Sequence, residues 1–138
     1  MNFGYAGKCL KIDLSTRNIC ELATSTHINR FLGGRGLAVK IYWDKTPTSA
    51  GVFDPENVLV FVTGPLCGLP VIGGSRWQVC GRSPATNPTA FSYGNFGGMW
   101  GAELKFAGYD ALVVEGQSEK SVYIYIHDNK VEIRDASS

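Results

Sequence analysis

The sequence lacks a dominant charge and has no long hydrophobic run. Thirteen Lys and Arg residues are matched by twelve Asp and Glu residues, which leaves a formal net charge of +1. Without a basic block, this balance argues against nucleic-acid binding through bulk electrostatics. No run approaches the roughly 18 apolar residues of a membrane-spanning helix, and the start, MNFGYAGKCL, does not resemble a signal peptide. We therefore expect a cytoplasmic protein with no nucleic-acid or membrane partner.

The cysteines lack the spacing of a metal site. Cys9, Cys20, Cys67 and Cys80 lie far apart in the sequence, unlike the ligands of a C-x2-C zinc motif or a compact iron-sulfur run. Their neighbours are apolar, which is typical of small buried side chains in a reducing compartment. We expect no metal site built from this chain's cysteines.

Common catalytic motifs are also absent. The sequence contains no P-loop, no G-x-G-x-x-G after a predicted strand and no G-x-S-x-G. His27 and His127 have no obvious nucleophile partner, while Asp110 and Glu115 are better interpreted as a cap and a solvated carboxylate than as an acid/base pair. We nominate no catalytic residue in this chain.

Glycine is what the sequence has in excess. Of 138 residues, 17 are glycine, well above the usual share of about 7%. The segment 92–110, SYGNFGGMWGAELKFAGYD, alone contains five, although its second half has the pattern of a helix. Glycine costs roughly 0.5–1 kcal/mol relative to alanine inside regular structure, so the cluster indicates either close packing or a bound anion.

The hydrophobic pattern predicts a single α+β domain over 1–138, with largely antiparallel sheets and two or three helices. The apolar run at 58–63 is typical of a strand buried on both faces. The tryptophans have apolar neighbours, so core packing is expected for them. The chain stops directly after a predicted strand, which suggests truncation. The predicted elements are strands 10–14, 19–22, 58–63, 76–80, 111–115, 122–126 and 131–133, and helices 27–32 (capped by Thr26), 37–43 and 98–107 (closed by Gly108).

Two segments could together form an anion site. Gly73 to Arg76 delivers a guanidinium at the start of a strand, and Gly94 to Gly98 places bare backbone before a helix. Arginine suits phosphate because its donors form a rigid fork, and free N–H groups at a helix start favour anions. The alternative is that these glycines only allow tight packing and that Arg76 pairs with a surface carboxylate. For the third cluster, Gly33 to Gly36, a structural role is favoured over a ligand.

Six collinear motifs resemble the N-terminal domain of the aldehyde ferredoxin oxidoreductase family, whose members are tungsten or molybdenum enzymes with a bis-pterin cofactor. The resemblance covers essentially the whole chain. The motifs are G-x-x-L-K-I-D-L-S-T at 7–16, FLGGRGLA at 31–38, DPENVLVFVTGPLCG at 54–68, GGSRWQVCGRSP at 73–84, GNFGGMWGAELKFAGYDALVVEG at 94–116 and VYIYIHDNKVEIRDAS at 122–137.

The resemblance implies that this domain is a base for the two pterins. It assigns a pterin contact to Arg76 and another to Gly97. It assigns to Asn95 a backbone carbonyl that binds a Mg²⁺ ion bridging the pterin phosphates, which agrees with the preference of Mg²⁺ for oxygen ligands. It implies that the [4Fe-4S] cluster is held by other domains.

For the intact enzyme, the resemblance implies anaerobic oxidation of an aldehyde to a carboxylic acid, with electrons passing to ferredoxin or a similar carrier. This chain alone is expected to be inactive, and its partners would be the remaining domains or a subunit, with a homo-oligomer also open. The first alternative is a non-catalytic scaffold or assembly module that keeps the fold without the cofactor. The second is a generic nucleotide-phosphate binder.

Overall fold

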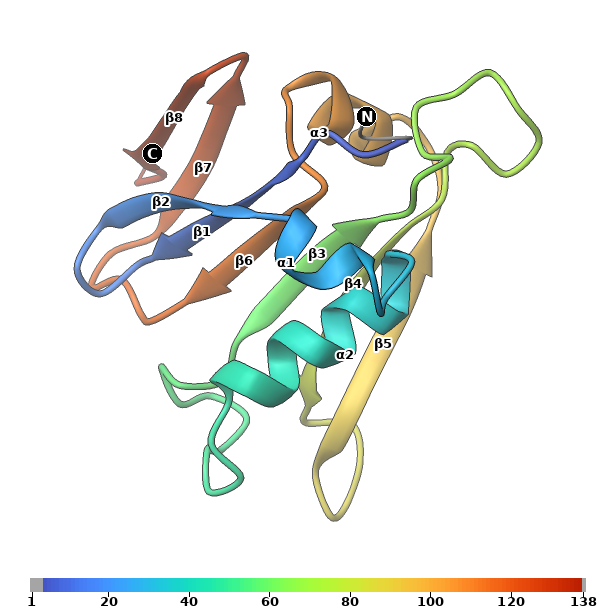
Figure 1. The fold of residues 1–138 in the computed structure, drawn as a ribbon. Helices are drawn as coiled ribbons and strands as arrows, with labels where there is room; N and C mark the ends of the chain where they lie inside the picture. The colour runs from blue at the N-terminus through green and yellow to red at the C-terminus, as the bar shows by residue number, and fades with distance from the viewer. Residues whose placement is uncertain (1–3, 138) are drawn as a thin grey trace.

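A six-stranded sheet organises the fold (Figure 1), and the computed structural model describes residues 4–137. The strand order in the sheet is β2-β1-β6-β3-β4-β5, and β7 and β8 form a separate two-stranded sheet. The bounds are β1 Lys8–Asp13, β2 Asn18–Ala23, α1 Ser25–Ile28, α2 Gly34–Lys45, β3 Leu59–Thr63, β4 Trp77–Ser83, β5 Ala90–Phe96, α3 Trp100–Phe106, β6 Ala111–Glu115, β7 Val122–His127 and β8 Lys130–Asp135.

The strand pairing confirms the predicted α+β class with largely antiparallel sheets. Neighbouring strands run antiparallel except at β1 and β6, which pair in parallel with Cys9 opposite Ala111. This parallel pair brings together segments that are about a hundred residues apart in the chain. The described part of the chain contains no helix long and apolar enough to cross a bilayer.

Helix α2 covers one face of the sheet. Its residues Leu37, Ala38 and Ile41 are buried against alternate strand residues, among them Val60 and Val62 of β3. In Figure 1 the helix crosses in front of β3, β4 and β5. Burial of these aliphatic side chains supplies most of the hydrophobic stabilisation on this face.

The β7–β8 hairpin packs on the opposite face, over β1 and β6. Ile124 and Ile133 of the hairpin contact the cluster that contains Leu10, Ile12 and Leu112. An isolated two-stranded hairpin is marginally stable in water, so this packing holds it in place. Helix α3 contributes the buried Leu104 to the same cluster.

The first two helices differ from their predicted bounds. Helix α1 spans Ser25–Ile28 rather than 27–32, and the Thr26 hydroxyl donates to the Ala23 carbonyl instead of capping a helix. Helix α2 already begins at Gly34 rather than after Gly36. The predicted left-handed closure of the third helix is confirmed, since Gly108 has φ +93°.

The hydrophobic pattern of the sequence did not predict one of the strands. Residues 90–96 form β5, which pairs along β4 from Ser83 opposite Ala90 to Trp77 opposite Phe96. The segment contains Gly94 and Asn95, both depleted in strands, so its local sequence favours a loop. Pairing with β4 supplies the hydrogen bonds that override this preference.

Three of the four cysteines are buried, as their apolar neighbours indicated; Cys20 is half-buried. Burial raises the pKa of Cys80 to about 11. Because the thiolate is the nucleophile, we expect iodoacetamide at pH 8 to modify Cys20 first and Cys80 only on unfolding. Peptide mass spectrometry over time tests this, and modification of Cys80 as fast as Cys20 would contradict it.

The same shift predicts how stability depends on pH. The unfolded chain releases the Cys80 proton at a lower pH than the folded chain, so the free energy of unfolding should fall as pH rises from about 9 toward 11. Cys80→Ala, in which this proton is absent, should flatten that part of the profile and serves as the control.

Candidate functional site

The two candidate anion-binding segments meet at one end of the β4–β5 hairpin. Arg76 directly precedes β4 and Gly97 directly follows β5, and the pairing of Trp77 with Phe96 places them opposite each other. A Cβ built on Gly97 would lie 3.8 Å from the Arg76 Nη1 atom. The structure thus brings close together residues from two separate segments of the sequence.

Side-chain hydrogen bonds fix this end of the hairpin. The Trp77 indole N–H donates to the Gly97 carbonyl at 3.0 Å. On the neighbouring pair, Gln78 Nε2 donates to Asn95 Oδ1 at 2.8 Å. The Trp77 bond holds the residue after β5 against the start of β4, and the Gln78 bond joins the side chains of the two strands.

The glycines of this loop and of the first turn of α3 serve different purposes. Gly98 has φ +79°, a left-handed conformation that requires glycine. Gly101 lies under Trp77, where a Cβ would have no room. Gly97 has neither constraint: its φ lies outside the left-handed range, and a Cβ there would meet only Arg76, at an ordinary contact distance. A ligand that approaches the main chain at Gly97 would explain this glycine.

The exposed groups at the site suit an anion. Arg76 and Asn95 are both exposed, and so is the backbone of Gly97 and Gly98. A guanidinium beside open main chain can bind phosphate oxygens through a planar pair of N–H donors. The residues present therefore fit the phosphate end of a bound cofactor.

The third glycine cluster lies at the start of α2, close to the same hairpin. A Cβ on Gly34 would lie 3.4 Å from Gln78 Oε1, and the Arg35 guanidinium stacks 3.9 Å from the Tyr93 ring centroid. Gly33 has φ +124°, and a Cβ there would lie 3.3 Å from Pro65. Backbone conformation accounts for Gly33 and for Gly34, which has φ +52°, in agreement with the structural interpretation; a Cβ on Gly36 would meet only Phe31, at 3.9 Å.

Comparison with known proteins identifies the family. The family model for the N-terminal domain of aldehyde ferredoxin oxidoreductase matches residues 9–138. The chain belongs to the aldehyde ferredoxin oxidoreductase family. It is 46% identical to the tungsten-containing aldehyde ferredoxin oxidoreductase of Thermococcus kodakarensis and 43% identical to that of Pyrococcus abyssi, each over 136 residues. Both alignments cover 98% of this chain but only 22% of the relative.

Proteins with other names also match this chain. The chain is 36% identical to the WOR-like subunit of an aliphatic sulfonate oxidoreductase from Pyrococcus furiosus. A solved structure, the active-site complex BamBC of benzoyl coenzyme A reductase with 1,5-dienoyl-CoA, superposes with a TM-score of 0.89 at 44% identity. That match covers 97% of this chain and 20% of the other. This chain therefore shares its α+β fold with that structure, and it spans about a fifth of the length of these relatives.

The sequence analysis did not identify Trp77, which holds Gly97 in place, or Gln78, which holds Asn95 in place. Both residues lie within the motif at 73–84, but nothing in that motif indicates which residues they contact. Their roles follow from β4–β5 pairing, and the strand β5 was itself not predicted. The described residues hold no group of three or more His, Cys, Asp or Glu side chains arranged to bind a metal ion.

Replacing Gly101 by Ala tests the packing role of the glycine inside α3. The new Cβ would lie 2.9 Å from Trp77 Cβ and 3.0 Å from Cys67 Sγ. We expect overpacking to cost about 1–3 kcal/mol of unfolding free energy, more than the roughly 1 kcal/mol that alanine gains in helix propensity. Urea denaturation measures the difference. The control is Glu103→Ala, at an exposed position of the same helix; a G101A protein as stable as the parent would contradict the packing role.

Proposed function

We propose that this chain forms the pterin-binding base of a tungsten- or molybdenum-dependent oxidoreductase. The observation that carries the proposal is that the exposed Arg76 lies beside Gly97. Neither backbone conformation nor packing explains why residue 97 is a glycine. The tungsten-containing relatives, at 43 to 46% identity, support a cofactor of that kind.

Each residue of the site has a proposed role. The Arg76 guanidinium would hold phosphate oxygens of a pterin through two parallel hydrogen bonds. Gly97 would let the ligand lie against the main chain. Asn95 would offer its backbone carbonyl to a Mg²⁺ ion that accompanies the pterin phosphates, because an oxygen ligand is the type that Mg²⁺ prefers. Gln78, bonded to the Asn95 side chain, would keep that residue in position.

The work of this chain would be binding and charge neutralisation. When bound, the metal-pterin group would supply the two-electron chemistry. The residues around the site would orient it and neutralise its phosphates, and we assign no acid or base among them. A [4Fe-4S] cluster held by polypeptide outside this chain, together with a ferredoxin-type acceptor, would supply the electron-transfer chemistry.

The proposed reaction is oxidation of an aldehyde to a carboxylic acid. The support is the name shared by relatives that are 43 to 46% identical. The sulfonate oxidoreductase subunit is less similar, at 36%. The benzoyl coenzyme A reductase structure matches at 44%, which makes reduction of an aromatic thioester the competing reaction to assay.

The test is the composition of the full-length enzyme. After anaerobic expression in a host that makes the cofactor, elemental analysis should find tungsten or molybdenum together with Mg²⁺. Oxidation should release a fluorescent pterin. A folded enzyme with neither metal nor pterin would reject the proposal in favour of the cofactor-free scaffold.

A further inference from the structure

On the sheet face opposite α2, the β7–β8 hairpin covers β1 and β6 but leaves the side of β3, β4 and β5 exposed. The rings of Phe61, Trp77, Phe96 and Trp100 lie in mutual contact over β3, β4 and β5, with centroids 4.3 to 6.5 Å apart. Phe96 is 44% exposed and Trp100 is 39% exposed. Core packing, which the sequence predicted for all three tryptophans, is thus wrong for Trp100 in this chain, and it is wrong for Trp43, which is 79% exposed.

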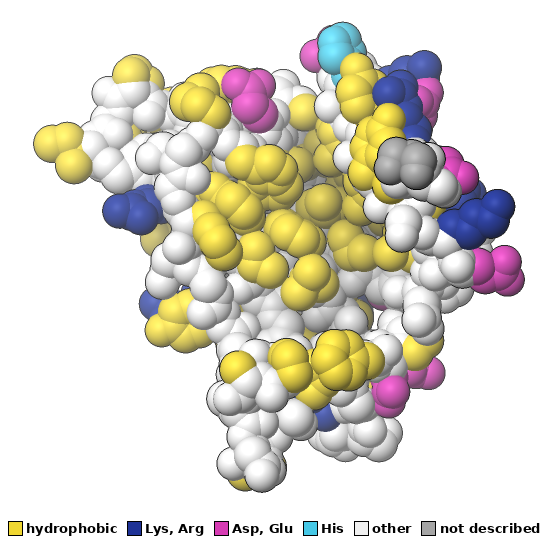
Figure 2. Space-filling model, turned by 180° about the vertical axis from the view of Figure 1, so that it is seen from behind, with side chains coloured by type: hydrophobic (Ala, Val, Ile, Leu, Met, Phe, Trp, Pro, Cys, Tyr) yellow, Lys and Arg dark blue, Asp and Glu magenta, His cyan; other side chains and the backbone are white. Residues whose placement is uncertain are grey.

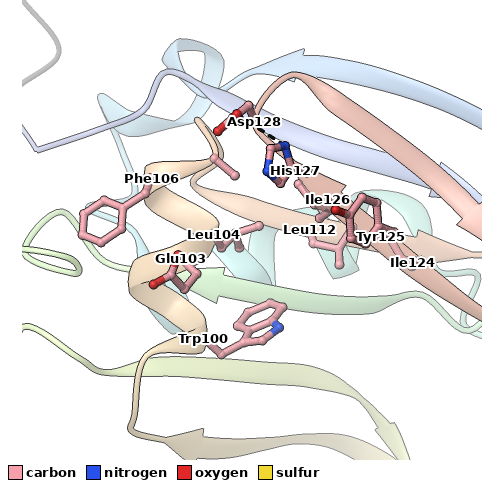
Figure 3. A pocket seen from close by; sticks show the side chains of 11 residues that line it. Trp100, Glu103, Leu104, Phe106, Leu112, Ile124, Tyr125, Ile126, His127 and Asp128 are labelled. Atoms are coloured by element: carbon pink, nitrogen blue, oxygen red, sulfur yellow. Dashed lines mark ion pairs between the residues drawn. The ribbon is translucent and has the colours of Figure 1, made fainter.

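The open aromatic face continues into a hollow beside the β7–β8 hairpin. A cavity of about 480 Å³ lies between α3 and the hairpin, with Trp100, Leu104, Leu112 and Ile124 among its lining residues. Figure 3 shows these side chains below His127 and Asp128. Seen from behind in Figure 2, apolar side chains gather in the middle of this face, while charged ones lie mainly toward its edges.

The sequence of β3 independently indicates that a layer is missing. Residues 58–63 form the continuous apolar run that is typical of a strand buried on both faces. In the structure, Val60 and Val62 are fully buried beneath α2, but Leu59 on the other face is 39% exposed. A contiguous apolar patch of this kind is rare on a free surface and marks a contact site.

From these observations we infer that polypeptide from the rest of the same enzyme covers the open face. The chain spans 22% of its curated relatives and matches the N-terminal domain of the family, so in those relatives most of the polypeptide follows this region. The β7–β8 hairpin already forms a partial second layer on this face. The occupant continues that layer over Phe61, Trp77, Phe96 and Trp100 with apolar side chains of its own.

This assignment uses neither Arg76 nor Gly97 as a binding site, but Trp77 and Phe96 border that site, so its test uses the full-length enzyme without the cofactor. A second copy of the chain is the alternative occupant. The two differ in their dependence on concentration, since a covering layer within one enzyme stays in place on dilution and a dimer contact does not.

Hydroxyl-radical footprinting of the full-length enzyme without the cofactor tests the assignment. The oxidation rate of Trp100 in the native enzyme is compared with its rate in urea. A fully covered side chain should be slowed at least about fivefold, more than its 39% exposure in this chain alone would give. Trp43, on α2 and 79% exposed, is the matched control for an uncovered tryptophan.

Two results would overturn the assignment. The first is native oxidation of Trp100 slowed less than about fivefold, which would leave the face open. The second is protection that disappears on dilution together with a dimer-to-monomer change in sedimentation, which would assign the face to a second copy. Protection that persists in a monomeric enzyme supports the inference.

Discussion

Asp110→Asn is expected to lower the free energy of unfolding by about 3–5 kcal/mol, the cost of breaking a buried ion pair by removing one partner. The Asp110 side chain is only 3% exposed, and its partner Lys105 is 9% exposed. The carboxylate accepts four hydrogen bonds, from the Ala6 N–H at 2.9 Å, the Gly7 N–H at 2.9 Å, the Thr24 hydroxyl at 2.7 Å and Lys105 Nζ at 2.6 Å.

The physical reason is that every partner of this carboxylate is a donor. An asparagine side chain has one oxygen acceptor and places an NH₂ group among the donors that the second oxygen had satisfied. The Lys105 ammonium would remain buried without its counter-charge, although it also donates to the Gly4 carbonyl at 2.6 Å. Loss of this network would release the segment before β1 from β6 and α3.

Urea denaturation of the parent and D110N proteins measures the effect. The matched control is Asp44→Asn, which breaks the exposed pair between Lys40 and Asp44 within α2. A surface pair one helical turn apart is worth about 0.3–0.5 kcal/mol. If the two substitutions cost the same, the buried network does not stabilise the fold as argued.

Arg76→Ala in the full-length enzyme should lower bound metal and pterin at least about tenfold while leaving the fold intact, because hydrogen bonds to charged groups contribute about 1.5–3 kcal/mol each. Arg76 is exposed, so its removal should leave the free energy of unfolding of the cofactor-free protein nearly unchanged. Elemental analysis and pterin fluorescence report occupancy, and circular dichroism reports the fold.

Two further variants sharpen this test. Arg76→Lys keeps the charge but loses the planar fork, so it should retain an intermediate amount of cofactor. Arg30→Ala removes another exposed arginine, after α1, and should have no effect on occupancy. Full occupancy in R76A would contradict the role proposed for Arg76 and favour the surface-pair interpretation of that residue.

The sequence predicted those elements whose signal is local. The β1–β2 hairpin, the strand at 111–115 and the final hairpin follow from alternation and turn residues. The left-handed Gly108 follows from the end of a helical pattern. In contrast, β5 was missed because its residues favour a loop, and only pairing with β4 makes a strand of them.

The site was predicted only as two separate segments. The resemblance marked Arg76, Asn95 and Gly97, but their meeting depends on the register of β4 with β5. Asp110 was interpreted as a simple cap, because nothing in the sequence connects it to Ala6, which lies 104 positions away.

The sequence by itself determined the α+β class, most strands, the family and the identity of the candidate anion-binding residues. These depend on short-range periodicity, backbone preference and collinear motifs, all of which lie within neighbouring residues. The tertiary structure alone decided that Arg76 lies opposite Gly97, that Asp110 is buried against Lys105, and that one aromatic face is uncovered. Each of these results from side chains brought together by long-range strand pairing and packing, which no local pattern specifies.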